Sequence, residues 1–221
     1  MILLALLIAY IPSANSLLKK TAERAQTLGR TREVTLSGTL TVSGEPARNA
    51  QLVFHFPLQC RMQGDGGLAL TVKGNAAEGN AGPALQLLQL SCPLLAYRGL
   101  AKDEPEGVLK GAALAAGVEL NGASSLARLY DRIVYVVGAG ARDMARPQLW
   151  VYKDNHAPAR LISSTGADLR LLEYGNPAAA EWFPRVFELW SSGQLAARFE
   201  VSEAKGARGS SSEEEEDDSG Q

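Results

Sequence analysis

Short segments in which apolar and polar residues alternate constrain the fold of this chain more than any other feature. In residues 34–42 every second residue is apolar or glycine, and the residues between them are threonine or serine. This alternation is the pattern of a strand that buries one face and exposes the other. Residues 50–56 repeat it after the turn sequence SGEP at 43–46, so the two segments predict a hairpin.

Similar segments return along the rest of the chain. Residues 58–64 and 68–72 flank the turn sequence GDGG, which predicts two more strands. Six further strands are expected, each bounded by Gly, Pro, Asn or Ser, at 132–138, 147–153, 158–164, 168–174, 184–191 and 194–202. Their short connections predict an antiparallel meander. Some of these segments are apolar on both faces, which predicts a curved sheet with helices or a cavity against its concave face.

Three helices are expected besides the strands. Residues 17–29 carry one apolar stripe. A leucine-rich helix begins at Pro83, and Pro93 is expected to break or kink it. A further helix opens with Asp103 as its cap and stops at Gly117. Because these leucine-rich helices stand between two runs of strands, they have to lie against the sheet. The expected fold class is therefore α+β.

The two ends are expected to lie outside this fold. Residues 1–12 form an uncharged apolar run, and small polar residues follow it. We interpret residues 1–16 as a secretory signal peptide cleaved after Ser16, and a buried N-terminal helix is the alternative. Residues 17–205 then form a single domain. Residues 206–221 have no apolar side chain beyond Ala207 and are expected to be a disordered acidic tail.

Charge and motifs exclude several classes of function. Six of the 24 acidic residues lie at 213–218, so residues 1–212 carry 22 basic residues against 18 acidic ones, too small an excess to predict nucleic-acid binding. Gly138-Ala139-Gly140 lacks the third glycine of a dinucleotide loop and is expected to be a turn. His55 and His156 show no metal-binding spacing and are expected to face solvent. Ser124-Ser125 does not lie in a nucleophile elbow. We therefore predict no catalytic residues, no cofactor and no metal.

Cys60 and Cys92 are the only cysteines. An even number in an exported protein is consistent with a disulfide bond, here between a strand and the leucine-rich helix. Such a bond would stabilise the fold by about 3–4 kcal/mol in the chain-entropy model. Two buried free thiols are the alternative.

The order of these elements resembles a known family. The resembling stretches are LLKKTAERAQTLGRTREVTLSGTLTVSG, LVFHFPLQCRMQGDGGLAL, PQLWVYKDNHAPARLISSTGADLRLLEYG and WFPRVFELWSSGQLAARFEV. They are similar to the periplasmic lipoprotein-carrier superfamily, the LolA-like outer-membrane lipoprotein-sorting proteins. The resemblance implies an unclosed (half) β-barrel with lid helices on a concave apolar face that accommodates acyl chains. It also implies a lid-closing arginine directly before Pro57, and Phe56 occupies that place here.

The resemblance and the pattern together favour a non-catalytic periplasmic carrier or binding protein for lipid or lipoprotein acyl chains. The alternative is a structural or sensory envelope module, like a sigma-factor-regulator domain, with a filled core and no ligand. A hydrolase is disfavoured because no catalytic residues can be named. Envelope proteins are possible partners, and contact with membranes is expected to be peripheral at most. The residues expected to line the ligand cavity are Leu36, Leu40, Leu52, Phe54, Leu87, Leu88, Trp150 and Tyr152.

Overall fold

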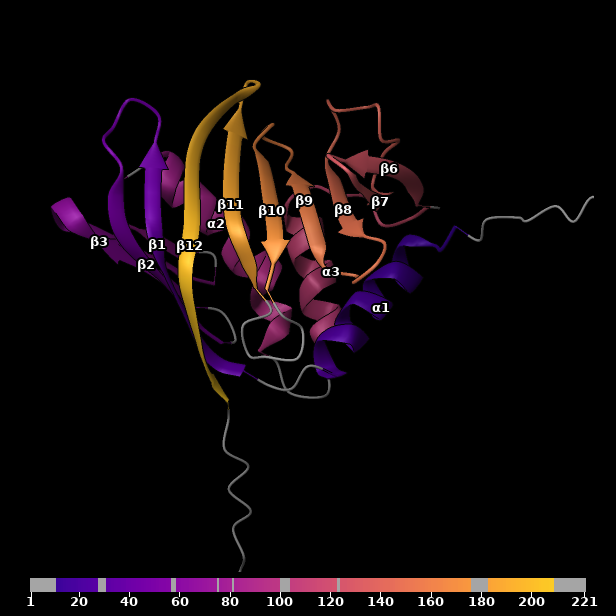
Figure 1. Ribbon diagram of the computed structural model, residues 1–221. Coiled ribbons are helices and arrows are strands. Elements are labelled where there is room, and N and C mark those ends of the chain that lie inside the picture. Colours follow the sequence, from indigo (N-terminus) through magenta and orange to yellow (C-terminus); the bar gives the residue numbers. More distant parts are fainter. Residues whose placement is uncertain are drawn as a thin grey trace, which may run out of the picture.

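The computed structural model shows an α+β protein built on one open antiparallel sheet (Figure 1). It describes residues 11–27, 31–56, 59–74, 76–80, 82–99, 104–122, 124–175 and 183–208. The helices are α1 (Ala14–Thr27), α2 (Pro83–Leu95) and α3 (Pro105–Ala115), with short 3₁₀ turns η1 (Asp65–Gly67) and η2 (Ala96–Arg98). The strands are β1 (Thr31–Val42), β2 (Arg48–His55), β3 (Gln59–Gly64), β4 (Leu68–Lys73), β5 (Ala76–Glu78), β6 (Ser125–Leu129), β7 (Arg132–Val137), β8 (Gln148–Tyr152), β9 (Pro158–Ile162), β10 (Asp168–Tyr174), β11 (Pro184–Ser191) and β12 (Gln194–Arg208).

The sheet consists of two meanders joined through the first and last strands. Its order is β5-β4-β3-β2-β1-β12-β11-β10-β9-β8-β7-β6, and every pair is antiparallel. Strands that follow one another in sequence are therefore neighbours in the sheet, except β5 and β6, which form its two edges, and β1 also pairs with β12. The predicted antiparallel meander and the unclosed curved sheet are confirmed.

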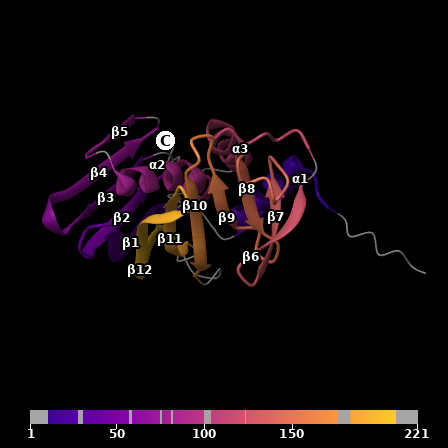
Figure 2. The same ribbon diagram turned by 90° about the horizontal axis from the view of Figure 1, so that it is seen from above.

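The helices lie on one face of the sheet, which we call the inner face (Figures 1 and 2). The connectivity explains this position, because the segment between β5 and β6 joins the two opposite edges of the sheet. It has to cross a face on its way, and α2 and α3 lie in it. Helix α2 contacts β3, β4, β10, β11 and β12, and α1 packs against α3 and η2.

The alternating apolar residues of the strands lie in the core, as the sequence predicted. Apolar residues of β1 and β2, such as Leu36 and Leu52, are fully buried under the helices. The residues between them, such as Ser37 and Gln51, lie on the opposite, outer face. Strands β8 and β9 are buried on both faces along their whole length. A second, smaller apolar cluster covers their outer face.

Proline and glycine mark the ends of the helices. Pro83 occupies the first turn of α2, as predicted. Pro93 lies inside α2, and the helix ends at Leu95, where the chain passes into η2. Gly117 follows α3 with a φ of 88°, a conformation that glycine adopts without strain. Asp103, the expected cap of α3, lies outside the described residues.

The structure differs from the sequence prediction at several boundaries. Helix α1 begins at Ala14, three residues before the expected domain start, while residues 1–10 lie outside the described part. Strand β12 continues to Arg208, because β1 begins at Thr31 and offers these residues a partner. Two short edge strands, β5 and β6, lie in stretches for which no bounded strand was predicted. Residues 209–221 of the predicted tail are not described.

Candidate functional site

Six of the eight residues expected to line a ligand cavity come together on the inner face. Each of them has no exposed surface, and all belong to the main core between the sheet and the helices. Strands β1 and β2 and helix α2 supply them: Leu36, Leu40, Leu52, Phe54, Leu87 and Leu88. The apolar concave wall expected from the sequence is therefore present, and α2 covers it.

Trp150 and Tyr152 do not join this group. They lie on the outer face of β8 in the second apolar cluster, whereas Leu149 and Val151 point into the main core. Both faces of β8 are apolar, so the sequence could not distinguish them. Burial raises the pKa of Tyr152 to about 12, and its hydroxyl donates to the carbonyl of Leu171 at 3.2 Å.

A disulfide bond fixes α2 to the sheet. Cys60 at the start of β3 is bonded to Cys92 near the end of α2, with their Cα atoms 5.9 Å apart. Both residues are buried. The attachment lies at the C-terminal half of α2, and the Pro83 end of the helix carries no such bond.

Just beyond the C-terminal end of α2, aromatic rings and one buried arginine also hold the helical cover. Phe56, in the place where the family resemblance implies an arginine, lies so close to Gly99 that a Cβ there would be 1.9 Å from its ring. Phe56 also packs against Phe54 and Phe183, with ring centroids 6.1 and 6.2 Å away. An arginine comes instead from η2: Arg98 donates to the carbonyl of Ala25 at 3.3 Å and lies over Phe183.

Arg98 is only 3% exposed, and its position has an electrostatic consequence. Burial lowers the pKa of its guanidinium, and nearby Tyr97 and Tyr174 oppose this shift. Burial also raises the pKa of the Tyr97 hydroxyl well above its usual value. Arg98 thus joins η2 to the end of α1 and to the ring of Phe183, the residue before β11. Sequence analysis missed Arg98, although an arginine next to a leucine-rich helix was a visible signal.

A cleft opens into the inner face at the Pro83 end of α2. Its volume is about 310 Å³. Core residues Val42 and Leu70 form its apolar depth, and the first turn of α2 forms one wall. Arg48 and Glu45, which form an ion pair, stand at its rim. This cleft is where residues of the main core reach the surface beside the helical cover.

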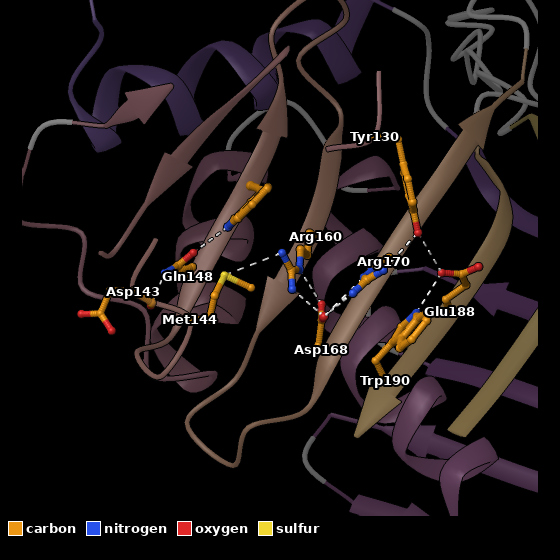
Figure 3. Close-up of polar contacts among 10 residues, drawn as sticks. Tyr130, Asp143, Met144, Gln148, Arg160, Asp168, Arg170, Glu188 and Trp190 are labelled. Atoms are coloured by element: carbon orange, nitrogen blue, oxygen red, sulfur yellow. Dashed lines mark hydrogen bonds and ion pairs between the residues drawn. The ribbon is translucent and has the colours of Figure 1, made fainter. Parts of the chain in front are cut away.

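The outer face carries an array of arginines, carboxylates and aromatic rings (Figure 3). Arg160 makes two hydrogen bonds of 2.6 Å to Asp168, and Arg170 approaches the same carboxylate at 3.0 Å. Glu188 accepts from Trp190 at 2.9 Å and from Arg198 at 2.8 Å. Each charge therefore has an opposite partner.

Aromatic rings and a hairpin turn close this array. Arg160 lies over Trp150 and Arg170 over Trp190, with the guanidinium carbons 4.7 and 4.3 Å from the ring centres. Tyr130, at the turn between β6 and β7, accepts from Arg170 at 3.0 Å. We interpret the array as structural, because it satisfies its own charges and offers no nucleophile beside a base.

The minor candidates have ordinary structural environments. Gly138 lies in the connection between β7 and β8, with a φ of 101°, as expected of a turn. His55 is half-exposed and 2.8 Å from Glu33. His156 lies in the β8–β9 turn, where burial, Lys20 and Arg24 lower its pKa.

Ser124 is buried and donates to the carbonyl of Pro12 at 2.6 Å. No metal-binding group of three or more His, Cys, Asp or Glu occurs within the described ranges.

No family model matches the chain, and no curated protein matches it. Solved structures do. One is a domain assigned to outer membrane lipoprotein sorting from Vibrio parahaemolyticus, with a TM-score of 0.49 and 9% identity, covering 90% of this chain and 94% of that one. A LolA superfamily protein from Nitrosomonas europaea has a TM-score of 0.43 and 14% identity, over 88% and 93%.

A third similar structure is MucB in the MucA/MucB complex of Pseudomonas aeruginosa, with a TM-score of 0.32 and 14% identity, over 90% of this chain and 59% of that one. The first two are named for the superfamily that the sequence resembles. At these identities the similarity concerns the fold, and function has to be inferred from the side chains of this chain. Among the described helices, none is long and apolar enough to cross a membrane.

Proposed function

We propose that this protein is a non-catalytic binding protein of the cell envelope that holds lipid acyl chains between its sheet and α2. The observation that carries the proposal is the apolar inner wall, which extends from fully buried Leu40 and Leu52 to the cleft beside Pro83. Each buried methylene of an acyl chain would contribute about 0.8 kcal/mol. Because the inner face is made of leucine and phenylalanine, it suits an acyl chain better than a polar ligand.

The disulfide bond gives α2 a fixed end and a free end. About nine residues separate Cys92 from Pro83 in a helix that rises roughly 1.5 Å per residue, so the cleft lies about 13 Å from the fixed point. A chain entering at the cleft would lift the Pro83 end while Cys92 holds its position. Entry then requires displacement of one helix end, and the sheet stays intact.

Substitution of Gly82 tests this entry route. Gly82 is exposed, lines the cleft, and has open space around the position of a Cβ. Gly82→Trp should fill the cleft and weaken binding of a fluorescent fatty-acid probe at least tenfold, with an unchanged melting temperature. Gly122→Trp is the matched control, since Gly122 is equally unobstructed and lies outside this cleft. Failure of the unmodified protein to bind the probe would overturn the proposal, and unchanged binding by Gly82→Trp would overturn the entry route.

Export to the periplasm belongs to this proposal, because lipoprotein acyl chains are handled there in the family that the sequence resembles. A native mass spectrum of the protein purified from its own envelope should show a copurifying lipid. Generic ester substrates should not be hydrolysed, because the proposed role is binding alone.

A second candidate function is an envelope module with a filled core and no ligand. The observation that favours it is the complete burial of the inner-face residues, together with the disulfide bond that holds α2 down. In that case Leu40→Asn would leave a buried amide unpaired, at a cost of about 1–3 kcal/mol, and would remove no binding activity. A protein that binds no apolar probe and is destabilised in this way is such a module.

A further inference from the structure

The outer face of the sheet has two halves of different character. Over β9–β12 it carries paired charges, among them Arg160 with Asp168 (Figure 3), and neighbouring rings cover them. Over β12 and β1–β4 it is open and hollowed into a groove of about 690 Å³. We name this hollow the outer groove. Its polar lining consists of Ser37, Asn49, Gln51, Gln63, Asp65 and Ser202.

The backbone shapes the outer groove. Gly38 and Gly64 lie in it, and the sheet permits no side chain at either position. A Cβ at Gly38 would lie 1.9 Å from the carbonyl oxygen of Glu200, and one at Gly64 would lie 2.3 Å from that of Asn49. The register between β1 and β12 also shifts here, which leaves Ser202 without a paired residue and places it in the groove.

The side chains of the groove position one another. Gln63 donates to Gln51 and Gln51 to Ser37, both at 3.4 Å, and Asn49 donates to Asp65 at 3.0 Å. Ser202 donates to the backbone carbonyl of Ser37 at 3.1 Å. An amide has two donor hydrogens and an acceptor oxygen, and each of these contacts uses only one of them. Donors and acceptors therefore remain side by side on adjacent strands, about 4.8 Å apart.

We propose that the outer groove binds a neutral oligosaccharide. Sugar hydroxyl groups donate and accept at once, which matches alternating amide and hydroxyl side chains. Charge complementarity supports the same ligand, since no basic side chain occurs among the described residues that line the groove, and its one carboxylate is engaged by Asn49. A phosphorylated or sulfated ligand would find no counter-charge among these lining residues, and an acyl chain would find only Leu68 and two alanines.

This inference does not rest on the proposed lipid binding: the groove shares Gly67, Leu68 and Ala69 with the cleft beside Pro83, whereas Gln51 and Gln63 line the groove alone. Isothermal titration with neutral oligomers of N-acetylglucosamine, glucose and galactose, four units long, tests it. The protein should bind at least one of them. The double variant Gln51→Ala/Gln63→Ala should bind at least tenfold more weakly with an unchanged melting temperature, since both residues are exposed.

Gln194→Ala is the matched control, because Gln194 is an exposed glutamine of β12 outside the groove. It should bind like the unmodified protein. Absence of binding to all three oligomers would overturn the proposal. So would equal binding by the double variant, or a preference for a sulfated oligomer or a serine- and glutamine-rich peptide over the neutral sugars.

Discussion

Cys92 of α2 is bonded to Cys60 of β3, and this bond ties the helical cover to the first meander of the sheet. The two residues are 32 positions apart, so the bond closes a loop that contains β3, β4, β5 and most of α2. Because that loop links both walls of the proposed binding site, the bond affects stability and opening together.

Removal of the disulfide bond should lower the free energy of unfolding by about 3–4 kcal/mol, the entropy expected for a loop of this length. Guanidinium denaturation of the unmodified protein and of the Cys60→Ala/Cys92→Ala variant measures the difference. Thiol labelling of denatured, unreduced protein is the control and should modify neither cysteine. Labelling of both would show that the bond does not form.

Gly99→Ala should destabilise the protein by about 1–3 kcal/mol, because the new Cβ would overlap the ring of Phe56. The overlap involves the inner atoms of the phenylalanine side chain, which cannot swing aside as a flexible end would. Phe56→Gly, which removes the Cβ that would lie 2.1 Å from the new one, should make Gly99→Ala almost neutral. Gly107→Ala is the control: this position in α3 has free space, so alanine should stabilise the helix by about 0.5–1 kcal/mol. Equal effects of the two glycine substitutions would contradict the contact.

Stability should fall in mildly acidic solution because of His156. Burial, and then Lys20 and Arg24, lower the pKa of its imidazole in the folded protein. The unfolded chain then binds this proton more readily, so stability is lost as the pH falls through the usual value of about 6.5. His156→Asn suits the φ of 56° at this position and removes the titrating group. The melting temperature of the variant should depend less on pH between 7.5 and 5.5, and parallel curves would refute the assignment.

The strands were predictable from the sequence because a strand with one buried face shows apolar and polar residues in alternation. β7 and β11 lie where the turn residues that bound them placed them, and β1 lies where alternation placed it. The pairing of β1 with β12 was not predictable, since it joins residues far apart in the chain and no local pattern records it. Edge strands β5 and β6 are short, and β5 has no buried residue to give it a pattern.

The candidate site was predictable only where one face of an element is apolar. Leu36 and Leu40 alternate with threonine and serine, so their burial followed from the pattern. Trp150 stands between Leu149 and Val151, and nothing local indicates its face. The outer groove escaped prediction for a different reason. Its polar residues look like an ordinary solvated face until the bulge at Ser202 and the bare glycines are seen in the sheet.

Truncation should separate the folded part of the C-terminus from the acidic tail. Removal of residues 209–221 should change the melting temperature by no more than about 1–2 °C, because an acidic, apolar-free segment contributes little folding stability. Removal of residues 206–221 also deletes the end of β12, which pairs with β1 as far as Thr31. This longer truncation should lower the melting temperature further. A large effect of the shorter one would show that the tail packs on the domain.

The N-terminus of the exported protein should be Leu17 or a close neighbour, and sequencing of the chain from its native host decides this. Cleavage after Ser16 has a cost in stability, because it removes contacts at the start of α1. The amide of Ala14 donates to Gly122 at 3.2 Å, and Ser124 donates to the carbonyl of Pro12 through both its backbone and its hydroxyl. A chain that starts at Leu17 leaves buried Ser124 without this partner and should be about 1–3 kcal/mol less stable than one that starts at Ile11. An intact Met1 would refute export, and a mature start at Ile11 would move the cleavage site to keep these bonds.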